Sequence, residues 1–339
     1  RTQTLGIERR RTTARSGCTL VDQRPCSCLC RRTIWELRLC NSSCFASTIF
    51  PTSRRIEAKF CHRHAQRRTC CNDRPHLAHY GRKNCTLVLK KAELKDFLDQ
   101  KAEQYEHPNF IEHDPIWIPH QYELKEDVEI MAFLISILAW GQRITIINNG
   151  KLLGELFGHQ PYEAIKSRDF SGHPLVEAFK HRTFNGIDLD FFIRSIKHIY
   201  QEHGGLEMAF SRGSNSLERI EHFRSLFLET EHQDRSEKHL ASPAKGSSAK
   251  RLNMFLRWMV RSSSKGVDFG LWSSIKPSEL LPPLDVHTAR TARQLGLLKR
   301  NQNDWRSVEE LGNKLRELDP DDPVKYDFAL FGLGVNGEL

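Results

Sequence analysis

The sequence predicts an all-α protein, in which a multi-helical domain over residues 87–339 follows a first segment of different character. Apolar residues recur at helical spacing along almost all of the domain, whereas few segments alternate with the period of two that a half-buried strand needs. Residues that start or stop helices flank several of these apolar stripes.

Charge and cysteine are distributed unevenly, and both separate the first segment from the domain. Residues 1–90 carry a formal charge of +14 and residues 91–339 one of −5, so the overall +9 comes from the first quarter of the chain. All ten cysteines precede residue 86. The domain therefore has no disulfide framework and no thiolate metal site, which is typical of a cytoplasmic protein.

Residues 1–86 fit several interpretations. Arginine-rich sequence with the cluster Cys26, Cys28 and Cys30 suggests a zinc-binding or nucleic-acid-binding arm, but the spacings do not form two clean ligand pairs. An organellar transit segment would also be rich in Arg and poor in acids. Because the first methionine is Met131, we favour a disordered extension or an upstream stretch read in frame, and we place it outside the fold.

The remaining chain predicts a series of helices and no membrane span. The longest apolar run, Val128 to Trp140, is interrupted by Glu129 and is shorter than the roughly 20 residues that a bilayer requires. A polar segment over 229–249 predicts a loop between two lobes, 87–230 and 231–339. Helices are expected around 94–98, 126–140, 189–200, 217–226, 249–261, 285–295, 305–315 and after Pro323.

The most informative stretch leads from a Pro/Gly/Ser turn into the helix over 249–261. On a helical wheel, Lys250, Asn253, Arg257 and Arg261 fall within about 80° of one another, opposite an apolar face. This pattern predicts one face packed on the core and one cationic face that contacts phosphate. An ordinary solvated helix face is the alternative.

The turn itself suits an anion. Amides at a helix start lack intrahelical partners, and the helix dipole adds to their attraction for negative charge. The predicted nucleic-acid-binding residues therefore combine the turn with the cationic face: Lys245, Gly246, Ser247, Ser248, Arg251, Arg257 and Arg261.

Two further residues carry the candidate chemistry. Lys250 lies in the first turn of its helix, where the dipole disfavours a cation, and an amine held there could act as a nucleophile. Asp285, in the segment Pro283-Leu-Asp-Val-His287, stands where a helix N-cap belongs. A carboxylate held there by backbone amides could take a proton or stabilise positive charge, although a plain cap and a lysine reaching into solvent explain the same residues.

Two family resemblances meet at these residues. Over about 90–339 the chain resembles a family of bacterial conserved hypothetical proteins without an assigned activity. The segments that carry this resemblance include Asp114-Pro-Ile-Trp-Ile-Pro-His120, Leu138-Ala-Trp-Gly-Gln-Arg143, the stretch Lys250 to Arg261, and the stretch Asp322 to Gly334.

Over about 239–334 the chain is similar to the helix-hairpin-helix DNA glycosylase superfamily, which includes the endonuclease III-like enzymes. The resemblance implies a hairpin that binds DNA phosphate, with Lys250 at the catalytic lysine position and Asp285 at the catalytic aspartate position. Lys250 follows Gly246 by four residues, and 35 residues separate it from Asp285, more than in compact members. The iron–sulfur cysteines of some members are absent and no His-Glu-x-x-His spacing occurs, so no cofactor and no metal are expected.

Three hypotheses follow. The first is a DNA-repair glycosylase or lyase with Lys250 as the nucleophile and Asp285 as the acid/base. The second is a non-catalytic, helical DNA-binding or scaffold protein that keeps the phosphate-binding hairpin. The third is a helical domain whose cationic face binds another anion. The sequence identifies no protein partner.

Overall fold

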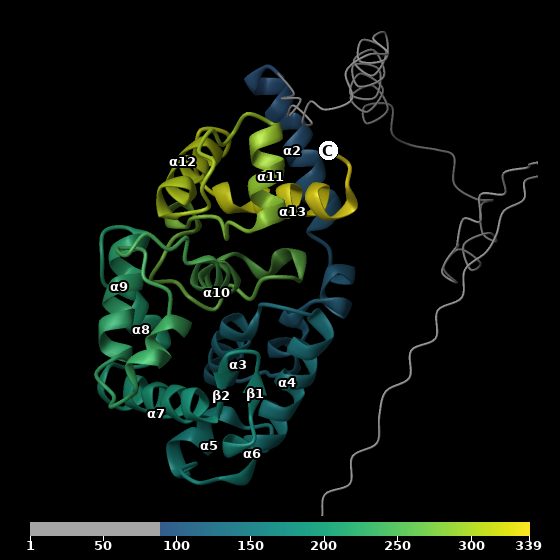
Figure 1. The fold of residues 1–339 in the computed structure, drawn as a ribbon. Helices are drawn as coiled ribbons and strands as arrows, with labels where there is room; N and C mark the ends of the chain where they lie inside the picture. The colour runs from purple at the N-terminus through teal and green to yellow at the C-terminus, as the bar shows by residue number, and fades with distance from the viewer. Residues whose placement is uncertain (1–88) are drawn as a thin grey trace, which may run out of the picture. The chain divides into compact units, whose positions relative to one another are not determined.

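The structure, a computed structural model, describes residues 89–339, so the predictions for residues 1–86 lie outside it. Within the described part the prediction of an all-α fold is confirmed, and the antiparallel pair Lys180–His181 (β1) and Phe184–Asn185 (β2) forms a short hairpin (Figure 1). The helices are α2 (Lys91–Tyr105), α3 (Lys125–Leu138), α4 (Arg143–Leu156), α5 (Pro161–Ser167), α6 (Pro174–Glu177), α7 (Gly186–Glu202), α8 (Leu206–Ser211), α9 (Ser216–Phe227), α10 (Lys250–Val260), α11 (Val286–Gln294), α12 (Trp305–Arg316) and α13 (Tyr326–Asn336).

Helix α3 is the buried core helix that its apolar run predicts. Every residue from Asp127 to Leu138 is buried. Glu129 interrupts the run but is hydrogen-bonded inside the core, since Tyr200 Oη and Trp272 Nε1 each donate to its carboxylate at 2.6 Å. Burial raises the pKa of Glu129 despite these bonds. The acid therefore fits the core because its oxygens are paired.

An aromatic cluster joins α3 to the helices around it. Phe133 of α3 meets Phe223 of α9 and Phe255 of α10 with ring centroids 5.4 and 5.5 Å apart, and Phe210 of α8 stacks on Phe223 at 3.9 Å. Edge and offset contacts of this kind add to the free energy gained from apolar burial. This cluster fixes the position of α10 against α3.

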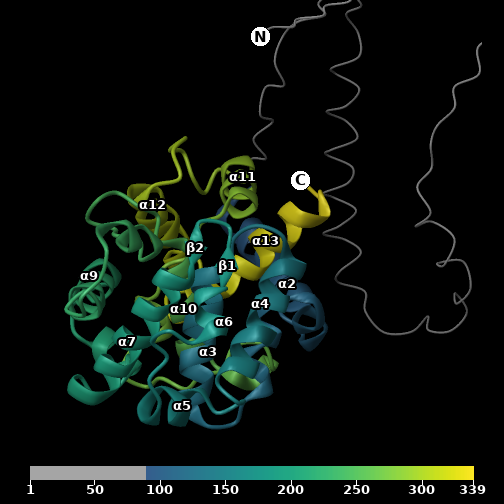
Figure 2. The same ribbon diagram turned by 60° about the horizontal axis from the view of Figure 1, so that its bottom comes forward.

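Helix α10 lies between two groups of helices. Its apolar face packs on α3, while α2, α11, α12 and α13 lie on its other side (Figure 1). Helix α2, the first described helix, packs against α13, the last (Figure 2), and α11 packs on α13 as well. A boundary at residue 230 would thus separate α2 from the helices on which it packs.

Helix termini follow the capping signals in the sequence. Asp285 caps α11 by accepting a hydrogen bond from Thr288 N at 2.7 Å, and Asp304 caps α12 by accepting one from Ser307 N at 3.1 Å. Ala289 and Ala292 are fully buried on α11, which packs against α13.

Among residues 89–339, no helix combines the length and the apolar character that crossing a membrane would require.

Candidate active site

The structure brings Lys250 and Asp285 together at one pocket. Lys250 Nζ lies 3.6 Å from Asp285 Oδ2, although 35 residues separate them in the chain. The two side chains are 36% and 12% exposed, so the pair lies at the surface end of the pocket, with the carboxylate deeper than the amine. The amine and the carboxylate that the first hypothesis names therefore lie side by side. Their chemical roles stay a prediction.

The two carboxylate oxygens of Asp285 have different partners. Oδ1 accepts the hydrogen bond from Thr288 N that caps α11, and Oδ2 faces Lys250. The cap fixes the orientation of the carboxyl group because the first-turn amides of a helix need an acceptor. Asp285 is thus both a structural cap and a carboxylate directed at an amine.

The pocket has a volume of about 160 Å³ and lies among α10, α11, α13 and the segments before α3 and α4. This volume is below the several hundred Å³ typical of drug-sized ligands and suits a single small group. Its wall contains both apolar and charged side chains, among them Met254, Trp258, Phe331, Asp114, Arg143, Lys250, Arg257, Asp285 and Asp327.

Behind the pair, a chain of polar contacts leads into the protein. Thr288 Oγ1 donates to Asp327 Oδ1 at 3.4 Å, and Arg257 donates to Asp327 Oδ2 at 2.5 Å. Burial raises the pKa of Asp327 to about 6 against the opposing charge of Arg257, and the negative charge of Asp285 adds to the rise. The inner carboxyl group is therefore easier to protonate than an ordinary aspartate.

A third carboxylate, that of Asp114, lies on another wall of the pocket. Asp114 caps a short 3₁₀ helix by accepting from Ile116 N at 3.1 Å, and Arg143 lies 3.9 Å from its other oxygen. Burial raises the pKa of Asp114, which the positive charges of Arg143, Arg257 and Lys250 partly oppose. The sequence analysis did not include Asp114 and Arg143 among the candidate site residues, since their separation from α10 in the chain conceals the shared pocket.

The prediction of unpaired amides in the turn is wrong for Gly246 and Ser247. Gly246 N donates to Pro243 O at 2.8 Å, and Ser247 N donates to Ser242 O at 3.1 Å. Glu221, on α9, accepts hydrogen bonds from Ser242 Oγ and Ala244 N at 2.6 and 2.9 Å. The backbone N–H groups of the turn are thus paired with carbonyl oxygens of the same turn, as buried or folded backbone generally requires. The Glu221 carboxylate adds two further hydrogen bonds to the turn.

Because the amides of Gly246 and Ser247 are paired, side chains rather than these amides are left to contact phosphate. Lys245, Gly246 and Ser247 are exposed and Ser248 is half-buried. Lys245 therefore stays available to an anion. Arg251 is engaged elsewhere, because its guanidinium donates to the carbonyl oxygens of Ile137 and His239.

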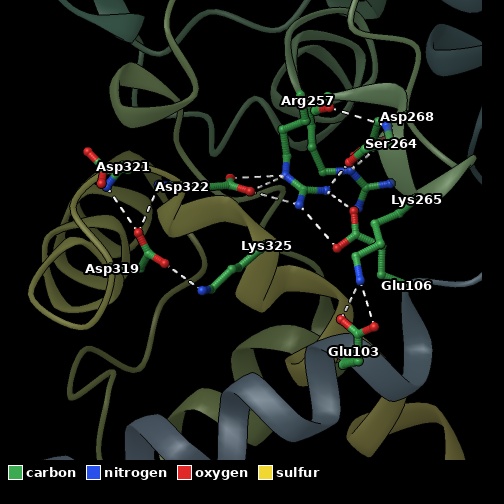
Figure 3. A network of polar contacts seen from close by, with 12 residues as sticks. Glu103, Glu106, Arg257, Ser264, Lys265, Asp268, Asp319, Asp321, Asp322 and Lys325 are labelled. Carbon is green, nitrogen blue, oxygen red and sulfur yellow. Dashed lines mark hydrogen bonds and ion pairs between the residues drawn. The ribbon is translucent and has the colours of Figure 1, made fainter.

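The prediction of an exposed cationic face on α10 is wrong for Arg257 and Arg261, which are 5% and 4% exposed. Arg261 donates to Glu106 at 2.7 Å, to Asp268 at 2.6 Å and to Asp322 at 2.8 Å (Figure 3). Burial opposes its charged form, yet these carboxylates together raise the pKa of Arg261. A helical wheel places the arginines on one face but cannot show that acids from distant segments cover it.

His287 and Arg290, which follow Asp285 in the sequence, have a different role. Arg290 donates to Gly334 O at 2.7 Å, and a ring nitrogen of His287 lies 3.4 Å from the same oxygen. Both side chains therefore hold the end of α13 against α11. The helical period places both residues on a different face of α11 from Asp285.

Residues 114–336, which include every pocket residue named above, match a family of proteins of unknown function, DUF2400. The chain belongs to the DUF2400 family. The expected membership in an uncharacterised family is thereby confirmed, and the DUF2400 match begins at Asp114, in the pocket wall. No curated protein and no solved structure matches the chain. Because DUF2400 membership names no reaction, a function has to be argued from the pocket.

Proposed function

We propose that this protein is a DNA-repair glycosylase or lyase, with Lys250 as the nucleophile and Asp285 as the group that accepts its proton. The observation that carries the proposal is the 3.6 Å separation of amine and carboxylate at the mouth of a small pocket. The motif resemblance of 239–334 to helix-hairpin-helix glycosylases supports the choice of substrate, since it assigns the same two residues to catalysis.

In the proposed reaction, a damaged nucleotide is turned out of the duplex so that its sugar reaches the pair. The Lys250 ammonium transfers a proton to Asp285, and the neutral amine attacks C1′ of the deoxyribose. The bond between C1′ and the base nitrogen breaks, and the base departs with the electron pair and takes the proton from Asp285. The secondary ammonium formed on Lys250 then gives a proton back to Asp285. As the bond between C1′ and O4′ breaks, O4′ takes up this proton and a protonated Schiff base remains on Lys250. Asp285 is well suited to its part because the cap at Thr288 holds it in place.

Borohydride trapping on DNA with an abasic site tests the proposal, because reduction makes a Schiff base permanent. We expect a covalent protein–DNA adduct with the full chain and none with Lys250→Ala. Lys166→Ala is the matched control, since this exposed lysine of α5 does not line the pocket and should keep the adduct.

Asp285→Asn separates chemistry from folding. The amide oxygen of Asn can still accept from Thr288 N, so α11 keeps its cap while the carboxylate charge is lost. We expect unchanged thermal unfolding and adduct formation slower by about 10²-fold or more, the usual size of a general acid–base contribution. An adduct that survives Lys250→Ala would contradict the proposal.

A non-catalytic DNA-binding protein is the second candidate, favoured by the exposed side chain of Lys245 beside a turn whose amides are already paired. It predicts salt-sensitive binding to duplex DNA that Lys245→Ala weakens, without any adduct on a panel of lesions.

A further inference from the structure

Away from the pocket, three side chains converge where α7 and α9 end. His198 lies in the last turns of α7, His203 is its C-cap residue, and Glu229 lies two residues beyond α9. The two Nε2 atoms are 3.4 Å apart, and they lie 2.8 and 3.1 Å from the same oxygen of Glu229. One atom from each residue thus faces a common point, with all three atoms within 4.8 Å of one another.

The backbone after α7 creates this convergence. Gly204 and Gly205 adopt φ values of +73° and +96°, a region in which glycine avoids the steric cost of a side chain. His203 N and Gly205 N both donate to Ile199 O, at 3.1 and 3.2 Å. This tight reversal places the ring of His203 beside that of His198, with centroids 5.1 Å apart. The five-residue spacing differs from His-x₃-His motifs, so spacing alone does not reveal the group.

The separation of the two Nε2 atoms equals that of two ligands on a tetrahedral metal, whereas the two distances from Nε2 to the Glu229 oxygen are those of hydrogen bonds. Ligand atoms at about 2.0–2.1 Å from a tetrahedral zinc ion lie roughly 3.3–3.4 Å from one another. The Nε2 atoms already have this separation, and a slight retreat of the half-exposed Glu229 carboxylate would bring it to the same distance. Without an ion, both imidazoles must present an N–H to one oxygen, with the two N–H groups side by side.

The chemistry of the group also fits. Imidazole nitrogens with a carboxylate oxygen suit zinc, and partial exposure of all three side chains leaves a path for the ion.

We propose that His198, His203 and Glu229 bind one Zn²⁺ ion, with water as a fourth ligand. The ion ties the end of α7 to the end of α9. Because it joins two core helices, its effect is on stability.

Zinc titration of the full chain by calorimetry tests this site, after the cysteines have been blocked with N-ethylmaleimide. Every cysteine precedes residue 86, so the reagent removes competing thiolates without changing the helical domain. We expect the unsubstituted chain to bind one more equivalent of zinc than the double variant His198→Ala/His203→Ala. Glu229→Gln keeps a hydrogen-bond acceptor but loses the charge, and it should weaken the site by at least about tenfold.

His107→Ala is the matched control, because this histidine is exposed and lies far from the group in sequence. It should leave the zinc equivalent intact. Zinc should also raise the melting temperature of the unsubstituted chain and of His107→Ala, but not of the double variant. Identical zinc titrations for the unsubstituted chain, Glu229→Gln and the double variant would overturn the proposal and leave a hydrogen-bonded ion pair.

Discussion

Replacing Arg261 tests the finding that the basic face of α10 is internal. Arg261 is 4% exposed, and its guanidinium is shared among Glu106, Asp268 and Asp322. Arg261→Met keeps an unbranched apolar side chain near Phe328 but leaves Glu106 and Asp268, which are 7% and 1% exposed, without this cation. Removing one partner of a buried ion pair costs about 3–5 kcal/mol, a large part of the roughly 5–15 kcal/mol that holds a typical domain together.

Urea unfolding at neutral pH measures this loss. Lys265→Met is the matched control, because Lys265 and Glu103 form an ion pair in the same region with side chains 43% and 70% exposed. Losing so exposed a pair should lower the free energy of unfolding by less than about 1 kcal/mol. Arg261→Lys should fall between the two, since one ammonium cannot match the planar fork that spans three carboxylates.

For Arg261→Met, a loss below about 1 kcal/mol at neutral pH, equal to that of the Lys265→Met control, would refute the reasoning. The guanidinium would then be solvated and again available to a phosphate.

Two further predictions concern the pocket and the helix packing. The pKa of Asp327 is about 6 in the folded state, above the roughly 3.9 of an unfolded aspartate, so the folded state retains a proton that the unfolded chain has lost between about pH 4 and pH 6. The stabilisation from Asp327 is therefore lost as the pH rises through this window. Asp327→Asn has no such titrating group. The difference in free energy of unfolding, unsubstituted chain minus Asp327→Asn, should therefore fall by about 2–3 kcal/mol. Urea unfolding at several pH values measures this, and a difference that is constant with pH would contradict it. Gly332→Ala would place a methyl group 2.3 Å from the Tyr105 ring where α13 crosses α2, so the melting temperature should fall with a loss of about 1–3 kcal/mol. Val335→Ala, at a half-exposed position of the same helix, should change the melting temperature little. Equal melting temperatures for the two variants would contradict the prediction and show that α2 and α13 move apart to accept the methyl group.

Local features of the fold were predictable because they depend on neighbours along the chain. The apolar run of α3 predicts a buried helix, and Asp285 and Asp304 cap helices where the sequence places them. The short helices α5, α6 and α8 were not predicted, since elements of four to seven residues show too few turns for a periodic signal. Helix α4 was missed as well, with Gly150 and Gly154 among its buried residues.

The sequence by itself determined the helical class, the two residues Lys250 and Asp285 as candidates, and the confinement of every cysteine to the part of the chain before residue 86. Only the tertiary structure decided which charges meet. It brought Lys250 to Asp285, covered Arg257 and Arg261 with acids, and placed Glu221 under the turn at Gly246. Helical periodicity fixes the face on which a side chain lies, whereas its environment depends on which distant segment packs there, and electrostatic energies change steeply with that distance and burial.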